Sequence, residues 1–403
     1  MRHTDQSSIH VSSAGDAGIS SSNHILPLGG HIVEKAVSKT FGRAGVEING
    51  KRSSDVQVHD KRFFKRVAMG GSLGLGEAYM DGWWDCDRLD DFFTHILSSD
   101  APRASDHKWP SLWQDFCARV VNHQSQRRAF EVGERHYDLG NDLYEAMLDK
   151  RMTYTCAYWK SADCVDDAQE AKLDLVCRKI GLQPGDKVLD VGCGWGSFAR
   201  FAAERYGAEV VGITISKEQA ELTSERCKGL PVEIRLQDYR DCHDAAGKFD
   251  RVVSLGMMEH VGYRNYRTYM SMIYDNLRPN GLALIQVIGT MKSAHTTDPW
   301  LDRYIFPNSM LPSVKQFGEA IDGLFMMQDW HSFGHYYDLT LMAWYSNFEK
   351  AWGRLSASYD ERFRRMWRYY LLFCAGIFRS GKAQLWQVVM SKGRVPGVYE
   401  AVR

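Results

Sequence analysis

The chain has 403 residues, enough for about two or three domains. Its 50 Lys and Arg balance its 50 Asp and Glu, so the formal net charge is zero and we expect no nucleic-acid partner. The nine Cys contain no C-x-x-C pair, which favours reduced thiols over disulfides or a zinc site, and we expect no metal. The polar start lacks a secretory leader and no apolar run reaches the length of a membrane span, so we expect a cytoplasmic protein.

Composition along the chain predicts four segments. Residues 1–25, rich in Ser and Gly, are expected to form a flexible tail. Residues 26–98 contain pairs of adjacent aromatic residues and predict a small N-terminal domain. Residues 99–125 begin with a stretch rich in Ser, Asp and Pro and predict a linker and connector. Residues 126–403 would form the larger domain.

From residue 166 to residue 280, short apolar runs alternate with amphipathic stretches, as a parallel sheet with helical crossovers requires. The predicted strands are Val188–Val191, Glu209–Thr214, Val232–Leu236, Phe249–Leu255 and Gly281–Ile288, with a last strand at Leu385–Ser391. The predicted helices are Asp166–Ile180, Ser197–Tyr206, Lys217–Lys228 and Tyr266–Leu277, with a late helix over Phe363–Phe378. We therefore predict an open α/β sheet with helices on both faces, plus the small N-terminal domain.

A glycine-rich loop, Gly192–Gly196, follows the first predicted strand and precedes a predicted helix. This arrangement lets a nucleotide approach the backbone closely. The spacing is G-x-G-x-G rather than the G-x-G-x-x-G of dinucleotide sites, and Asp190 before it would repel a pyrophosphate but suits a ligand with an ammonium group. No carboxylate for a ribose ends the second strand, and Asp238 is the candidate for the adenine end. The pattern favours S-adenosylmethionine, and the alternative is a glycine turn without a ligand.

Seven motifs in one order resemble a known family. They are LGLGEAYMDGWWDCDRLD at Leu73–Asp90, HYDLGNDL at His136–Leu143, YTCAYWK at Tyr154–Lys160, VLDVGCGWG at Val188–Gly196, GITIS at Gly212–Ser216, MEHVG at Met258–Gly262 and YDLTLMAWY at Tyr337–Tyr345. From about residue 32 to its end, the chain resembles the cyclopropane-fatty-acyl-phospholipid synthases, relatives of the mycolic acid cyclopropane synthases. The resemblance implies a class I S-adenosylmethionine-dependent methyltransferase fold, which is Rossmann-like. The phospholipid-acting enzymes share the N-terminal block, which favours phospholipid as the substrate. The resemblance thus implies that residues 26–98 form a lipid-associated domain and residues 126–403 the catalytic methyltransferase domain.

The activity that the resemblance implies is methylene transfer from S-adenosylmethionine to the cis double bond of an unsaturated phospholipid acyl chain. Attack on the sulfonium methyl group would leave a carbocation, and bound bicarbonate would remove a proton so that the ring closes. By matching motif, Cys156 and Ile288 would offer backbone N–H groups to bicarbonate, Glu259 would accept its hydroxyl and the Tyr337 hydroxyl would complete the site. Gln286 stands where the family usually has His, and an amide can form hydrogen bonds but cannot relay a proton.

The resemblance also implies which residues bind the cofactor. Besides Asp190, the matching positions are Tyr154, Thr155, Gly192, Gly194, Thr214, Ile215, Gln219, Asp238, Tyr239 and Leu255. Simpler interpretations compete at the catalytic positions: Cys156 could be a small buried apolar residue, and Glu259 a carboxylate favoured at a helix N-terminus. His260 is interpreted as structural, because adjacent side chains usually point apart.

A basic cluster, Lys61, Arg62, Lys65 and Arg66, is either a solvated face or a contact for anionic head groups. With a bilayer lipid as substrate and no spanning segment, we expect peripheral contact with the inner face of the membrane, and a homodimer stays open. Two other functions stay open as well. One is a lipid C-methyltransferase that leaves a methyl or methylene branch without closing the ring, and the other is a silent, cofactor-binding lipid scaffold.

Overall fold

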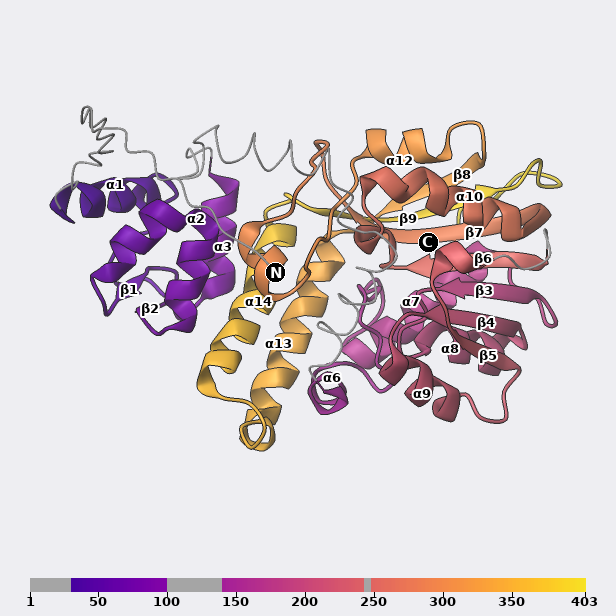
Figure 1. Cartoon of the computed structure of the whole chain (residues 1–403), viewed down its shortest axis with the longest axis horizontal. Helices are drawn as coiled ribbons and strands as arrows, with labels where there is room; N and C mark the ends of the chain where they lie inside the picture. Colours follow the sequence, from indigo (N-terminus) through magenta and orange to yellow (C-terminus); the bar gives the residue numbers. More distant parts are fainter. Residues whose placement is uncertain (1–29, 100–139, 243–247) are drawn as a thin grey trace, which may run out of the picture.

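The computed structural model of the protein describes residues 30–99, 140–242 and 248–403 (Figure 1). The predicted tail, nearly all of the predicted linker and the first half of the HYDLGNDL motif lie outside the described residues.

A mixed sheet of seven strands, in the order β5-β4-β3-β6-β7-β9-β8, forms the larger part of the molecule. The strands are β3 Lys187–Val191, β4 Glu209–Thr214, β5 Val232–Leu236, β6 Phe249–Leu255, β7 Leu277–Gly289, β8 Met326–Ser332 and β9 Gln384–Ser391. The first five strands in the sheet order are parallel, and β9 is antiparallel to both β7 and β8. The predicted α/β sheet is confirmed, while β8 was not predicted.

Helices cover both faces of the sheet (Figure 1). These helices are α7 Val165–Lys179, α8 Ser197–Tyr206, α9 Lys217–Arg226, α10 Tyr266–Asn276 and α12 Val314–Ile321. The other helices of this part are α6 Asn141–Met147, α11 Pro299–Tyr304, α13 His335–Leu355 and α14 Glu361–Arg379. Successive strand residues point to opposite faces, so Leu284 packs in a core with α7 and α8 while Ile285 packs in another with α10 and α12. All five predicted helices are present, and α13 was not predicted.

The N-terminal part packs directly on the helical hairpin of α13 and α14. It consists of α1 Gly30–Arg43, β1 Gln57–Val58, α2 Arg62–Met80, β2 Trp84–Asp85 and α3 Leu89–Ser98. Phe93 on α3 meets Tyr369 and Phe373 of α14, with ring centroids 5.0 and 4.7 Å apart. The backbones also approach closely, because a Cβ on Gly376 would lie 2.5 Å from the Cβ of Phe93. The paired aromatics of the sequence therefore build one core that reaches from the N-terminal part into α14.

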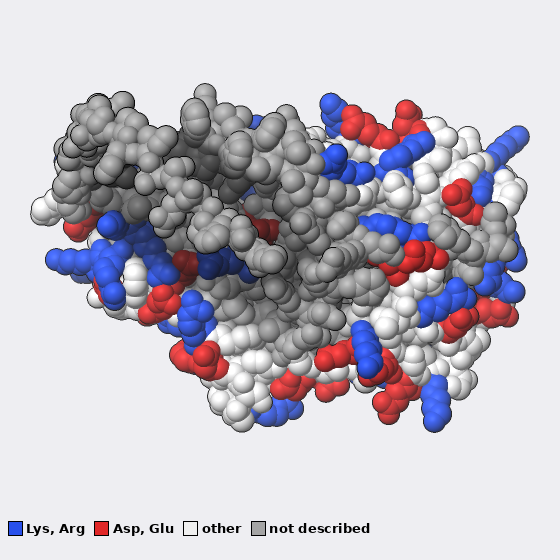
Figure 2. Space-filling model, in the orientation of Figure 1, with Lys and Arg blue, Asp and Glu red and all other residues white. Residues whose placement is uncertain are grey.

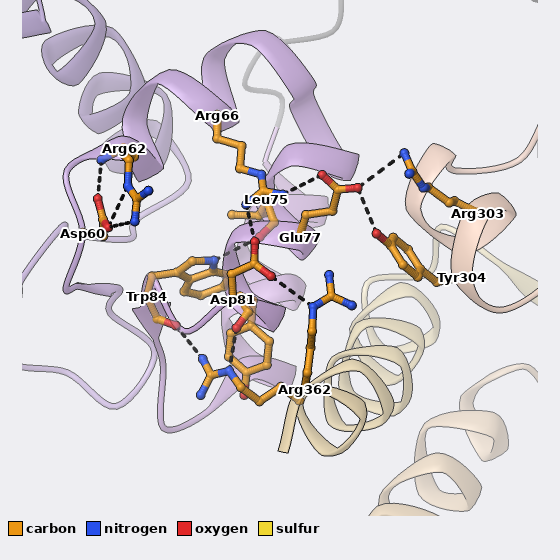
Figure 3. Close-up of polar contacts among 12 residues, drawn as sticks. Asp60, Arg62, Arg66, Leu75, Glu77, Asp81, Trp84, Arg303, Tyr304 and Arg362 are labelled. Atoms are coloured by element: carbon orange, nitrogen blue, oxygen red, sulfur yellow. Dashed lines mark hydrogen bonds and ion pairs between the residues drawn. The ribbon is translucent and has the colours of Figure 1, made fainter. Parts of the chain in front are cut away.

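Polar contacts cross the same junction (Figure 3). Glu77 of α2 accepts hydrogen bonds from Arg66 and from the Tyr304 hydroxyl, each at 2.9 Å. Asp81 at the end of α2 pairs with Arg66 and with Arg362 of α14. These contacts hold the N-terminal part against the segments that follow β7. Within the described residues, no helix has the length and apolar character needed to cross a bilayer.

Candidate active site

A cavity lies at the carboxyl ends of β3, β4 and β6, the usual ligand position in an α/β sheet. Every residue predicted to bind the cofactor lines it. They are Tyr154, Thr155, Asp190, Gly192, Gly194, Thr214, Ile215, Gln219, Asp238, Tyr239 and Leu255. The structure therefore brings together residues from three separate motifs and four residues outside them.

The glycine loop shapes the floor of the cavity between β3 and α8. Gly192, Gly194 and Gly196 all have positive φ angles, of 80°, 53° and 75°. A Cβ on Gly196 would collide with Thr223 of α9, at 2.3 Å, whereas a Cβ on Gly194 would meet nothing within 4 Å. Gly196 is therefore required for packing, and Gly194 leaves space that a ligand can use.

Asp190, at the end of β3, is a buried carboxylate with an unused oxygen. Among the described residues, its Oδ2 has no hydrogen-bond partner. Burial raises the pKa of Asp190 to about 7, although the charge of Lys172 opposes the shift. A buried polar atom without a partner is costly, and the ammonium group of S-adenosylmethionine would satisfy it. The residues present thus fit this cofactor.

Glu259 lies behind the cavity, in the short 3-10 helix η2 Met258–His260 that follows β6. Its Oε1 accepts a hydrogen bond of 2.7 Å from the Ile288 N–H on β7. Its Oε2 is buried and has no partner among the described residues. Burial raises the pKa of Glu259 to about 7, which places its titration near neutral pH. Ile288 packs with Cys156 and Tyr337 in a small apolar cluster, so the four residues predicted to hold bicarbonate belong to one region.

A family model described as mycolic acid cyclopropane synthetase matches residues 124–388. The chain belongs to the mycolic acid cyclopropane synthetase family. It is an enzyme of the S-adenosylmethionine-dependent methyltransferase class, and the family resemblance predicted from the motifs is confirmed.

Individual relatives extend this match beyond the family model. A cyclopropane-fatty-acyl-phospholipid synthase of Escherichia coli strain K12 is 51% identical over 359 residues, which are 89% of this chain and 93% of that protein. A probable fatty acid methyltransferase of Pseudomonas putida is 39% identical, over 75% of this chain and 79% of its own. The crystal structure of the mycolic acid cyclopropane synthase CmaA1, complexed with SAH and CTAB, superposes with a TM-score of 0.60 at 32% identity. That match covers 65% of this chain and 98% of CmaA1.

Cys156 lies in the small apolar cluster with Ile288 and Tyr337. Its thiol is buried, and burial holds its pKa far above the ordinary value. The neighbouring backbone is fixed by Thr340 of α13, whose hydroxyl accepts from the Ala157 N–H at 3.1 Å and donates to the Tyr336 carbonyl at 2.7 Å. Thr340 was not predicted, although a Thr in the middle of the apolar YDLTLMAWY motif was a signal.

Gln286 lies on β7 directly opposite Gln387 of β9. Its Oε1 accepts a hydrogen bond of 2.9 Å from the Gln387 Nε2, and both side chains are buried. Gln286 does not line the cavity. The pairing fixes the amide with its oxygen toward Gln387, which leaves the amide nitrogen as its donor for another group.

His260 lines the cavity, whereas the adjacent Glu259 does not. The two side chains thus point apart, as predicted. Burial lowers the pKa of His260 to about 4, so the ring is neutral at pH 7. Its ring meets Phe306 edge-on, with centroids 6.0 Å apart. His260 is therefore an uncharged part of the cavity wall, beside Met257 and Pro307, neither of which the sequence singled out.

Asp238, predicted for the adenine end, also has a structural role. Its carboxylate accepts from the Arg240 N–H and from the Arg240 guanidinium, both at 2.9 Å. The bond from the Arg240 N–H caps the N-terminus of the short helix η1 Tyr239–Asp241, which carries Tyr239 in the cavity wall.

Proposed function

We propose that the protein transfers a methylene group from S-adenosylmethionine to the cis double bond of an unsaturated phospholipid acyl chain, forming a cyclopropane ring. The observation that carries the proposal is the buried Glu259 carboxylate, which directly precedes the cavity-lining His260 and, among the described residues, keeps one oxygen without a partner. Ring closure needs a proton acceptor beside the cofactor, and simple methyl transfer to a heteroatom does not. The E. coli relative, which covers the N-terminal part as well, supports phospholipid as the substrate.

Aromatic side chains around the cofactor cavity suit a cationic intermediate on the acyl chain. Tyr154 and Trp195 line the cavity, and Trp344 packs on Tyr154 with ring centroids 5.3 Å apart. An alkene is a weak nucleophile, so the protein must hold it in line with the sulfonium methyl group. A ring face near the developing positive charge would stabilise it by about 0.5–2 kcal/mol.

Bicarbonate, when bound, would supply the base for ring closure. The Ile288 N–H and the Glu259 carboxylate would hold it, with the Cys156 backbone and the Tyr337 hydroxyl as further partners. Glu259 suits this role because its pKa of about 7 lets the carboxylate and its partner share a proton. The Ile288 N–H already donates to Glu259. When bicarbonate binds, this N–H must therefore turn from Glu259 to bicarbonate or donate to both.

Lipid analysis of a heterologous host that expresses the chain tests the proposal. We expect phospholipid acyl chains with cyclopropyl protons in their NMR spectra. The second candidate product is a branched acyl chain without a ring, because the Pseudomonas putida relative is a probable fatty acid methyltransferase. An unsaturated branched chain has the same mass as the cyclopropane, so the NMR signals decide between them, and a ring-free product would contradict the proposal.

Gln286→Ala should slow ring closure about 5- to 150-fold, because removing the amide leaves a buried oxygen of the bound anion short of one donor, at a cost of about 1–3 kcal/mol. Steady-state assays at saturating bicarbonate measure the effect. Gln286→His, which restores the family's usual residue, is the matched variant and should retain activity. A silent Gln286→Ala together with a ring-free product would show that Gln286 marks a different chemistry.

The two arginines and the two lysines of the basic cluster have different surroundings in the structure. Arg62 pairs with Asp60, and Arg66 pairs with Glu77 and Asp81 (Figure 3). Both guanidinium groups lie over the Trp83 ring. Lys61 and Lys65 are exposed, and within the described residues neither forms an ion pair. Figure 2 shows Lys and Arg side chains grouped at the end of the molecule that carries α1 to α3, with acidic side chains beside them. Within this cluster, Lys61 and Lys65 are thus the side chains that we expect to meet anionic head groups.

Replacing Lys61 and Lys65 by Gln should weaken binding to anionic vesicles about 30-fold, since each surface charge contributes about 1 kcal/mol. Met69, 79% exposed, follows at the same helical spacing and would extend this face toward the acyl region. Vesicle flotation at low and high salt measures the loss. Lys217→Gln with Lys315→Gln, which removes two exposed charges on α9 and α12, should bind as the wild type does. If both double variants bind vesicles equally well, Lys61 and Lys65 do not contact the membrane and belong only to a solvated surface.

A further inference from the structure

A buried lysine lies directly behind the wall of the cofactor cavity. Lys172, on α7, has no exposed surface, and its Nζ donates a hydrogen bond of 2.8 Å to the Thr155 hydroxyl. Thr155 lines the cavity, whereas Lys172 does not. Burying an ammonium group is costly unless its hydrogen bonds and nearby charges compensate for the lost water. The hydrogen bond therefore links the buried ammonium group of Lys172, which lowers the stability of the fold, to Thr155 in the cavity wall.

The Thr155 side chain is held on both of its branches. Its methyl group lies against Gly256, where a Cβ would be 3.0 Å from Cγ2, and its hydroxyl meets Lys172. β-branched side chains have few rotamers, so two contacts suffice to fix one. One helical turn before Lys172, Gln169 donates to the Thr155 carbonyl at 2.7 Å. Thus α7 fixes both the backbone and the side chain of this residue before a ligand arrives.

The direction of the Lys172 hydrogen bond decides what Thr155 offers to the cavity. Burial lowers the pKa of Lys172 to about 8, opposed by the charges of Asp149 and Asp190, so Nζ is protonated at neutral pH. An ammonium group can only donate, and the Thr155 oxygen must accept. Among the described residues the Thr155 hydroxyl makes no second hydrogen bond. Its own proton is therefore available to a ligand acceptor in the cavity.

The neighbouring charge shows which part of the cofactor lies there. The unpartnered Oδ2 of Asp190 suits the cofactor's ammonium group, and Asp190 is close enough to Lys172 for their charges to interact. In an amino acid the carboxylate and the ammonium group are attached to the same carbon, so both must lie in this region. We propose that Lys172 is a positioning residue, which orients the Thr155 hydroxyl to donate to the carboxylate of S-adenosylmethionine. This inference rests on the proposed use of that cofactor.

Calorimetry on the full chain with two probes tests the inference. One probe is S-adenosylmethionine, and the other is its decarboxylated analogue, which keeps the ammonium and sulfonium groups. Lys172→Met keeps the length of the side chain and should weaken binding of S-adenosylmethionine about 10-fold or more, while binding of the analogue stays unchanged. Thr155→Val should show the same pattern, and the double variant should lose no more than either single variant.

Lys179→Met is the matched control. Lys179 is also buried on α7, but it contacts Asp329 and His331 and does not line the cavity. Its loss should lower thermal stability and leave both affinities unchanged. Wild-type affinity of Lys172→Met for S-adenosylmethionine, or an equal loss for both probes, would overturn the inference. If Lys172→Met does not fold, unchanged binding by Thr155→Val overturns it instead. A wild-type chain that binds neither probe would contradict the proposed function itself.

Discussion

Glu259→Gln should lower kcat about 100-fold or more while cofactor affinity stays at the wild-type value. The amide keeps the size of the carboxylate, and its oxygen can still accept from the Ile288 N–H. Its other group, however, is an N–H donor where the proposed mechanism needs an acceptor, and general base catalysis commonly contributes about 100-fold or more. Single-turnover assays with saturating S-adenosylmethionine and added bicarbonate measure the chemical step directly.

The pH dependence gives a second measure of Glu259. Its pKa of about 7 predicts that wild-type kcat rises as pH rises through 7, and that the residual activity of Glu259→Gln lacks this step. The raised pKa also favours folding at low pH, and that contribution is lost as pH rises through 7. The variant should therefore gain thermal stability relative to the wild type above pH 7.

A control for carboxylate-to-amide exchange is Asp329→Asn. Asp329 is a buried carboxylate on β8 that pairs with Arg403 and Lys179, outside the cavity. It should lose stability and keep kcat. If Glu259→Gln retains full activity, or if wild-type activity is indifferent to bicarbonate, Glu259 does not serve the proposed base.

The central parallel strands could be predicted because they are apolar on both faces, as Val188 and Leu189 of β3 illustrate by packing in different cores. β8 escaped prediction since it is an edge strand with exposed Met326 and Met327 and with polar residues after them. The buried charge of Asp329 on this strand is paired with Arg403, which lies 74 residues later in the chain. No local sequence pattern predicts that pairing. In α13 the buried residues Leu341, Trp344 and Phe348 recur at helical spacing, so the sequence does carry a signal for this helix.

In the candidate site, too, some features follow from local sequence and others depend on how distant segments pack. The glycine loop and Asp190 are adjacent in sequence, so their geometry could be anticipated from one short motif. The pairing of Gln286 with Gln387 and the contact of Lys172 with Thr155 depend on how strands and helices pack. A single lysine in an amphipathic helix is normally expected to face water. Only the fold shows that Lys172 is buried.

Gly194→Val should abolish binding of both S-adenosylmethionine and its demethylated product. Gly194 has a φ of 53° and lines the cavity, and a Cβ there would meet no protein atom within 4 Å. The valine side chain would therefore extend into the space proposed for the ligand. A β-branched residue at positive φ is also strained, so part of any effect could arise from lost stability rather than from a blocked site.

Gly181→Val separates these two causes. Gly181, just after α7, has a φ of 57°, a Cβ there would also meet nothing within 4 Å, and the residue does not line the cavity. Both variants should lose similar stability in thermal unfolding, because the backbone strain is the same. Only Gly194→Val should lose cofactor binding by calorimetry. Wild-type affinity in Gly194→Val would place the cofactor elsewhere, and an equal loss in both variants would show that strain, rather than an occupied cavity, removes binding.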